Sequence, residues 1–334
     1  MERSSDGCLG RRWLIVPKDR YLQAVRGAAI TAVVLIHCLP QCDASVALRP
    51  LLNWAVAAFL FLSGLLTAEA RIARGGVLGR RIRHTLPPYV VWSLAYALLL
   101  QGSSVLGALK ALLTAGAAAQ MYFIAVYLQL TLLTPLLYRL LKWRPLIVYA
   151  ITPLSLAVYE ALTVAGIALP ILGRLFPMWL IFYVVGLDWE RWHSRLQGKL
   201  GVVSIALGMS LATQLILGFA WLRLGDYNMA TTQLKLSSVA TSLCVIAVIM
   251  LLPTSGKRRL SESFLADLGD ASFGIYLCHI FVLAVVRKAL AFFALPSVAG
   301  TALLWLVTLI LSFAFCALVR KGAPRRVAEL LGIS

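Results

Sequence analysis

Charged residues are scarce in this chain. They make up only 13% of its 334 residues, whereas 61% are hydrophobic, and a soluble domain of this length carries about a quarter charged residues. No stretch is polar enough to form a second, soluble domain. The scarcity of charge therefore excludes an ordinary soluble protein and favours a polytopic membrane protein with a single domain over residues 1–334.

Potential metal ligands are scarce as well. The six cysteines are scattered, mostly inside apolar runs, and no Cys-x-x-Cys pair occurs. Metal sites and redox dithiols need closely spaced ligands. We therefore expect no bound metal, and we interpret the cysteines as small, buried packing residues.

Acidic residues are outnumbered by basic ones, 13 to 31, which gives a formal net charge of +18. Such a surplus suits nucleic-acid binding. It also arises when basic residues collect in the cytoplasmic loops of a membrane protein. The positions of the basic residues along the chain distinguish the two explanations.

Long apolar runs recur from end to end, and a spanning helix needs roughly 20 apolar residues. The apolar stretch 104–118 contains Lys110 and is interpreted as an interfacial or re-entrant segment or an extra span. Pro87 and Pro88 are expected to close an arginine-rich loop and start the third span. We predict an all-α transmembrane bundle of about ten spans, at residues 22–39, 50–69, 86–101, 120–140, 145–163, 171–188, 199–221, 236–253, 271–294 and 299–320.

Ten spans place both termini on one side of the membrane. Of the 31 basic residues, 24 then lie on that side, including those of the N-terminal segment 1–20 and the C-terminal segment 321–334. This asymmetry predicts an integral protein of the cytoplasmic (plasma) membrane with both termini in the cytoplasm. The excess of basic residues is therefore explained by the lipid bilayer, and we expect no nucleic-acid partner. The other seven basic residues are Arg49, Lys110, Arg174, Arg223, Lys235, Arg287 and Lys288.

Two ionisable residues, Arg26 and His37, delimit the stretch "RGAAITAVVLIH" in the first span. Eleven residues at about 100° each make about three turns, so both side chains leave one face, about 16 Å apart along the axis. Arginine suits a phosphate and histidine suits proton transfer at neutral pH. The pair fits a ligand that is anionic at one end and reactive at the other, such as acyl-coenzyme A. Alternatively, Arg26 only anchors the helix at the headgroups and His37 is a satisfied interior residue.

A second group of polar residues lies in "GDASFGIYLCHI", where Ser272, Tyr276 and His279 share one helical face. This stripe is expected to face the protein interior or a cavity, as part of a catalytic site or as a seam that packs helices together. Glu160, near the outer end of the fifth span, is a candidate for orienting an imidazole or a sugar.

The arginine-rich loop before the third span carries Arg80, Arg81 and Arg83. These side chains are candidates for docking the phosphates of a nucleotide. Alternatively, they are topology signals that bind anionic lipid.

Several stretches, in this order, resemble the acyltransferase 3 family of integral membrane acyltransferases: "RGAAITAVVLIH", "FLFLSGLL", "RRIRHTLPPYVVWS", "MYFIAVYLQLTLLTPLL" and "FGIYLCH". The resemblance covers residues 20 to about 320. The chain departs from the family pattern at Gln23, where many members have an acidic residue, and at Gln120, where many have histidine. It is similar to the standalone form, without the fused extracytoplasmic hydrolase-like domain of some members.

The resemblance implies transfer of an acyl group, most often acetyl, from cytoplasmic acyl-coenzyme A to a carbohydrate hydroxyl on the far side of the membrane. It identifies His37 as the catalytic histidine and Arg26 as its paired arginine, and it assigns the donor to Arg80, Arg81 and Arg83. We therefore expect a membrane-bound O-acyltransferase that modifies a cell-surface glycan or glycolipid precursor, with acyl-coenzyme A and a carbohydrate acceptor as ligands. The further site residues that we expect are catalytic Glu160 and His279, and substrate-binding Tyr276, Ser272 and Gln120.

Other functions fit part of the sequence. A transporter or flippase of a polysaccharide or lipid-linked precursor would also have many spans with buried charges, although its usual internal repeats are not evident here. A structural subunit of a polysaccharide export complex would bind no coenzyme A. The sequence is compatible with a homo-oligomer.

The ten-span topology makes a direct prediction. A reporter fused after Asn228 should lie on the side of the membrane opposite to a reporter fused at the C-terminus, because an even number of spans separates the two termini and 222–235 is an outer loop. Alkaline phosphatase and green fluorescent protein fusions measure this. A cytoplasmic reporter at Asn228 would exclude the arrangement.

Overall fold

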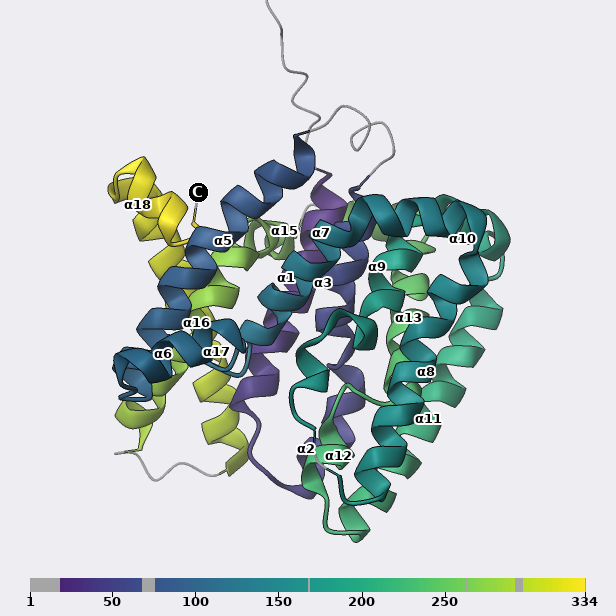
Figure 1. The fold of residues 1–334 in the computed structure, drawn as a ribbon, viewed down its shortest axis with the longest axis horizontal. Helices are drawn as coiled ribbons and strands as arrows, with labels where there is room; N and C mark the ends of the chain where they lie inside the picture. Colours follow the sequence, from purple (N-terminus) through teal and green to yellow (C-terminus); the bar gives the residue numbers. More distant parts are fainter. Residues whose placement is uncertain (1–18, 68–75, 168, 262, 292–296, 334) are drawn as a thin grey trace, which may run out of the picture.

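The computed structural model describes residues 19–67, 76–167, 169–261, 263–291 and 297–333 (Figure 1). These residues fold into a bundle of helices with no β-strand among them, which confirms the predicted all-α fold. Most of the N-terminal segment 1–20 lies outside the described residues, as do Arg71 and Arg74 of the arginine-rich loop.

The helices pack around a core that includes α1, α3, α7, α9 and α16. The segments η1, η3 and η4 are single 3₁₀ turns, and η2 is a π-helical turn that extends α5. In chain order the elements are α1 (Arg20–Cys38), α2 (Asp43–Leu48), η1 (Arg49–Leu51), α3 (Trp54–Leu65), α5 (Val77–Ala95), η2 (Tyr96–Leu100), α6 (Val105–Leu113), α7 (Met121–Trp143), α8 (Pro145–Val164), η3 (Leu172–Arg174), η4 (Phe176–Met178), α9 (Leu180–Leu187), α10 (Trp189–Leu196), α11 (Leu200–Arg223), α12 (Tyr227–Thr231), α13 (Leu236–Met250), α14 (Thr254–Ser261), α15 (Phe264–Asp270), α16 (Ser272–Leu290), α17 (Ser297–Gly322) and α18 (Arg325–Leu330).

Within the described part of the chain, eight helical stretches are long and apolar enough to cross a membrane. The two other predicted spans are helical but fall short of that criterion. The span predicted at 86–101 belongs to α5, whose first turns carry arginines, and the span at 171–188 is the eight-residue α9 preceded by η3 and η4. The eight stretches are Arg20–Cys38, Asp43–Leu65, Met121–Trp143, Pro145–Val164, Leu200–Arg223, Tyr227–Met250, Phe264–Leu290 and Val298–Gly322.

The expected start of the third span was wrong. Pro87 and Pro88 lie inside α5, which begins at Val77, directly after Gly76 in the left-handed conformation. The two prolines lack an N–H and so remove only the hydrogen bonds to the carbonyls of Arg83 and His84, and the helix continues through them. The arginines expected in a loop are therefore ordered on the first turns of a helix.

The stretch 104–118 contains only the nine-residue helix α6. At about 1.5 Å per residue this helix is far too short to cross a bilayer. An extra span at this position is thereby excluded. The stretch therefore adds no crossing to the predicted topology.

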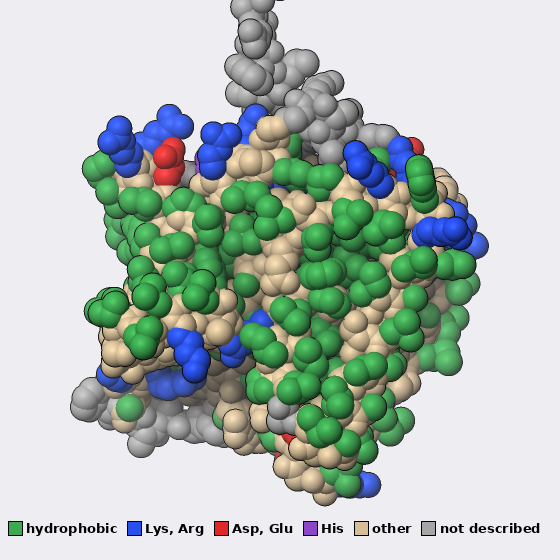
Figure 2. All heavy atoms as spheres, viewed as in Figure 1, with side chains coloured by type: hydrophobic (Ala, Val, Ile, Leu, Met, Phe, Trp, Pro, Cys, Tyr) green, Lys and Arg blue, Asp and Glu red, His purple; other side chains and the backbone are tan. Residues whose placement is uncertain are grey.

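The two ends of the bundle differ in charge. The beginnings of α1 and α5 lie at the same end as α10 and α18, whereas α2 and α12 lie at the opposite end (Figure 1). Figure 2 shows Lys and Arg side chains along the α10–α18 end, above a broad apolar band. Exposed side chains such as Val202, Ile205 and Met209 of α11 belong to that apolar surface. This distribution fits an integral membrane protein.

Two pairs of helices approach closely at reciprocal glycines. A methyl group built at Gly27 of α1 would lie 1.8 Å from the carbonyl oxygen of Leu265, and one built at Gly269 of α15 would lie 1.8 Å from that of Gln23. The helices α3 and α9 meet in the same way at Gly64 and Gly186, at 2.1 Å. Small residues let helix backbones come together in membranes, where van der Waals packing replaces the hydrophobic effect between helices.

The glycine contact makes a testable prediction. Gly269→Ala should lower the free energy of unfolding by about 1–3 kcal/mol, because the new methyl group collides with backbone and the helices must separate. Thermal unfolding in detergent measures this. Gly208→Ala in α11 is the matched control, since no neighbouring atom lies within 4 Å of its added methyl group. An equal melting temperature for the two variants would contradict the packing argument.

Candidate active site

Two cavities approach each other inside the bundle, one from each end. The cavity named here the Arg26 cavity has a volume of about 300 Å³, and the His37 cavity has about 410 Å³. Tyr276 of α16 lines both. Arg26 and His37 thus line two separate cavities, with Tyr276 between them.

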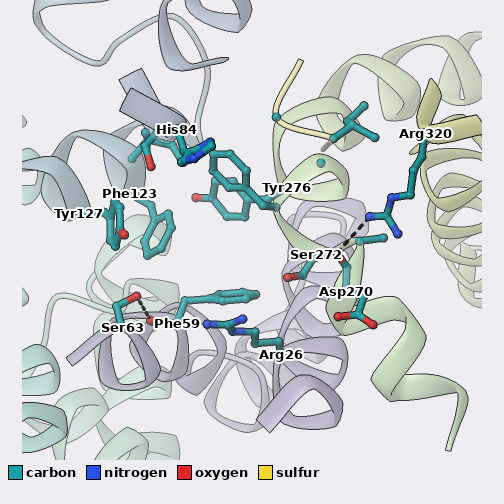
Figure 3. A pocket seen from close by; sticks show the side chains of 17 residues that line it. Arg26, Phe59, Ser63, His84, Phe123, Tyr127, Asp270, Ser272, Tyr276 and Arg320 are labelled. Carbon is teal, nitrogen blue, oxygen red and sulfur yellow. Dashed lines mark hydrogen bonds between the residues drawn. The ribbon is translucent and has the colours of Figure 1, made fainter. Parts of the chain in front are cut away.

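The Arg26 cavity is built from helices distant in sequence. Arg26 comes from α1, Phe59 from α3 and Tyr127 from α7, and Figure 3 shows these side chains with Ser272 and Arg320 around one space. The guanidinium of Arg26 lies 3.4 Å from Gln23 Oε1 and is half-buried. The cavity therefore has the guanidinium groups of Arg26 and Arg320 against the carboxylate of Asp270, next to aromatic walls. The excess of positive charge suits an anionic ligand with an apolar arm.

A groove continues this cavity toward the α18 end. It has a volume of about 560 Å³ and is lined by Arg80, Arg83 and Arg326. His84 lines both the groove and the Arg26 cavity, so the two spaces adjoin. We name this space the arginine groove. Three guanidinium groups here suit a ligand that carries several phosphates.

Arg81, the third arginine of this helix, has different contacts. Its guanidinium donates to the carbonyl oxygens of Ser63 at 3.4 Å and Leu66 at 3.3 Å, and to the hydroxyl of Thr67. Ser63 belongs to the last turn of α3, and Leu66 and Thr67 follow it, where carbonyls lack helical partners. The structure therefore separates Arg81, which caps α3, from Arg80 and Arg83 in the groove.

His37 and His279 lie side by side. The centroids of their rings are 5.3 Å apart, with His37 on α1 half-buried in its cavity and His279 on α16 fully buried. The Nδ1 atom of His279 lies 2.8 Å from the carbonyl oxygen of Tyr276 and 3.1 Å from that of Ile275. A carbonyl only accepts hydrogen bonds, so Nδ1 carries the proton and Nε2 keeps its lone pair.

Tyr276 forms the wall between the two cavities. Its hydroxyl donates to the backbone carbonyl of Gln120 at 2.7 Å, and only 3% of the residue is exposed. Its ring packs against Phe123 and Phe59, at centroid distances of 5.1 and 6.4 Å. Among the described residues, Tyr276 is the one side chain that lines both cavities.

The polar stripe of α16 faces the protein interior, as predicted. Ser272 is 6% exposed and lines the Arg26 cavity, and His279 is fully buried beside His37. The stripe therefore contributes Ser272 to the Arg26 cavity and Tyr276 to both cavities, whereas His279 lies behind His37 and lines neither.

Gln120 lines the His37 cavity at the start of α7. It is 1% exposed, and neither atom of its side-chain amide has a hydrogen-bond partner among the described residues. A buried amide is costly unless it is paired.

Glu160 is not brought together with the two histidines. Its carboxylate accepts a hydrogen bond of 2.8 Å from the backbone N–H of Leu236, the first residue of α13. A carboxylate at a helix N-terminus satisfies a free N–H and interacts well with the helix dipole. The contact assigns Glu160 a structural role, and its predicted role in catalysis has no geometric support among the described contacts.

The comparison with protein families agrees with this arrangement. The model of the acyltransferase 3 family, described as an acyltransferase domain, matches residues 19–321. The chain belongs to this family. It is a membrane acyltransferase, and the match includes every residue that lines the two cavities except Gly332 and Ile333. No curated protein and no solved structure matches the chain.

Several residues of this acyltransferase site were not identified in the sequence. Gly332 and Ile333 line the Arg26 cavity because the segment after α18 folds back against α16 and α5, where the indole of Trp92 donates to Leu331. No sequence pattern marks that segment. Arg49 and Arg174 line the His37 cavity. Their signal was present, since both are among the few basic residues on the less basic side.

The separate contacts of Arg81 and Arg80 make a prediction about stability. Arg81→Ala should lower the free energy of unfolding by about 1–3 kcal/mol, because it leaves the carbonyls at the end of α3 without their charged donor. Arg80→Ala removes the same charge from an exposed position and should leave the melting temperature unchanged. Thermal unfolding in one detergent compares them, and equal shifts would show that Arg81 does not stabilise α3.

Proposed function

We propose that this membrane acyltransferase moves an acyl group, most often acetyl, from acyl-coenzyme A to a hydroxyl of a cell-surface glycan or glycolipid precursor. The observation that carries the proposal is the pair of cavities that approach from opposite ends of the bundle and are divided by Tyr276. One holds fixed positive charge, and the other holds a histidine next to a second histidine. A donor and an acceptor can therefore be bound on opposite sides of the membrane.

The donor is assigned to the α18 end of the bundle. Arg80, Arg83 and Arg326 would hold the phosphates of the nucleotide part, since guanidinium groups bind phosphate oxygens bidentately. The pantetheine arm would enter the Arg26 cavity past His84 and lie against Phe59 and Tyr127. The excess of basic residues at this end favours its placement in the cytoplasm, where acyl-coenzyme A is available.

The acceptor is assigned to the His37 cavity. Tyr122 and Trp179 line it with stacked rings, 5.3 Å between centroids and 29° between planes. Aromatic faces of this kind suit the apolar faces of sugar rings. The free amide of Gln120 can both donate to and accept from a sugar hydroxyl.

His37 acts as the general base. As the acceptor oxygen attacks the thioester carbonyl carbon, His37 takes the hydroxyl proton. The new C–O bond forms, the C–S bond breaks, and the same proton passes from the imidazolium to the leaving thiolate. Charge and atoms balance, and no further reactant is needed. His279 packs against His37 and fixes the position of its ring.

The Tyr276 ring has to move for the reaction to occur. The thioester enters from the Arg26 cavity, whereas His37 lies beyond the Tyr276 ring. Rotation of this ring breaks the hydrogen bond to the Gln120 carbonyl. In the closed position the ring keeps water and the acceptor away from the donor.

The proposal predicts a specific defect at His37. His37→Gln should reduce acyl transfer by a factor of about 10² to 10⁴, the usual contribution of a positioned acid–base group, because glutamine cannot take the proton. Binding of acyl-coenzyme A should persist, since its phosphates are assigned to the arginine groove beyond Arg26, and Arg26 is itself about 16 Å from His37 along α1. Inside-out membrane vesicles supplied with labelled acetyl-coenzyme A measure transfer through the label recovered in carbohydrate.

His193→Gln is the matched control, since His193 lies on α10 beside Trp189 and lines neither cavity. Transfer by this variant should equal that of the parent. Normal transfer by His37→Gln would show that His37 is not the general base. A parent protein that moves glycan across the vesicle membrane without labelling it would instead support a transporter.

A further inference from the structure

The charge of the His37 cavity is unusual for its position. Arg49 from η1 and Arg174 from η3 both line it, and no aspartate or glutamate is among the described residues that do. By the predicted topology these arginines lie on the outer side, which holds only seven of the 31 basic residues. Two of the seven therefore converge on one cavity.

These two arginines have few hydrogen-bond partners and no ion-pair partner among the described residues. Arg174 donates one hydrogen bond, 2.7 Å long, to the backbone carbonyl of Thr114, and its other donors remain available. Arg49 forms no ion pair with any described residue, and both side chains are half-buried. A half-buried guanidinium without an anion has lost part of its hydration and gained little in return. The arrangement is that of a site for an anion.

A third arginine nearby is different. Arg287 donates to the backbone carbonyl of His37 at 3.3 Å and lines an adjoining recess, which His37 also lines. Its contact with the protein helps to position His37, and Arg287 does not line the His37 cavity itself.

A second observation points to a ligand in the same cavity. The amide of Gln120 is 1% exposed, lines the cavity and has no partner for either polar atom among the described residues. The stacked rings of Tyr122 and Trp179 form one wall. Two guanidinium groups in a cavity that also has aromatic rings and an amide in its wall match a sugar that carries a negative group.

We propose that the acceptor carries an oxyanion, a phosphate or a carboxylate, which Arg49 and Arg174 hold while a hydroxyl of the same molecule faces His37. This inference rests on the proposed function and names the chemical class of its acceptor. The planar guanidinium groups bind such oxyanions in a fixed orientation. They therefore select which hydroxyl reaches the base, and they discriminate against neutral sugars.

The test compares sugars of different charge. The protein is placed in nanodiscs of phosphatidylcholine, and saturation-transfer NMR measures binding of methyl glucuronide, glucose 1-phosphate and the neutral methyl glucoside. At least one anionic sugar should bind roughly ten- to a hundredfold more tightly than the neutral sugar, because each hydrogen bond between ions is strong. The first two sugars distinguish a carboxylate from a phosphate.

Variants locate the preference. Arg49→Gln and Arg174→Gln should each remove most of it, Arg49→Lys should keep part of it, and Arg223→Gln, an exposed arginine at the end of α11, should leave it intact. Unchanged melting temperatures show that the variants are folded. Equal affinity for neutral and anionic sugars in the parent, or a preference that survives both glutamine variants, would overturn the inference.

Three further outcomes separate the possible causes. If phosphatidylglycerol in the nanodiscs abolishes the preference, the arginines bind lipid headgroups and the inference is rejected. If the preference holds but labelled acetyl-coenzyme A labels no carbohydrate, the anion site stands and the proposed function fails. If carbohydrate is labelled without any preference for anionic sugars, the proposed function stands and the inference fails alone.

Discussion

The close contact between helix backbones at glycine is the constraint on which the site depends. Gly27 follows Arg26 directly, and Gly269 precedes Asp270, so the contact that brings α1 onto α15 also fixes two residues that line the Arg26 cavity. In a membrane such contacts gain dispersion energy and cannot rely on the exclusion of water. A larger side chain at either glycine would move Arg26 relative to the opposite wall. The equivalent contact at Gly64 and Gly186 fixes α3, which contributes Phe59 to that wall.

The same packing gives the protein two compartments. α1 presents Arg26 to one cavity and His37 to the other, and α16 supplies Ser272, Tyr276 and His279 along the matching path. Because the helical period is 3.6 residues, the polar residues of each helix lie on one face. The polar faces of α1 and α16 are turned toward each other, as the contact of His37 with His279 shows. Tyr276 lines both cavities and lies between them, so on the proposed mechanism its ring has to move before an acyl group can pass.

The basic residues have different tasks at the two ends. At the α18 end many arginines are exposed, and their number fits both topology and phosphate binding. Arg81 shows that individual residues in such a cluster stabilise the fold, because its donors are used by the end of α3. At the opposite end basic residues are few. The presence of Arg49 and Arg174 in one cavity there is therefore a stronger indication of a ligand site than the many basic residues at the α18 end.

The sequence by itself determined the helical fold, most of the spans and the relation of Arg26 to His37, because these follow from hydrophobic length and helical period along one segment. It did not determine that α5 continues through Pro87 and Pro88, since a helix tolerates lost hydrogen bonds when tertiary packing supports it. Only the tertiary structure decided that His279 lies beside His37, that Arg81 caps α3 and that Glu160 caps α13. These contacts join residues from distant helices, and their distances depend on how closely the backbones approach at a few glycines, which no local pattern encodes.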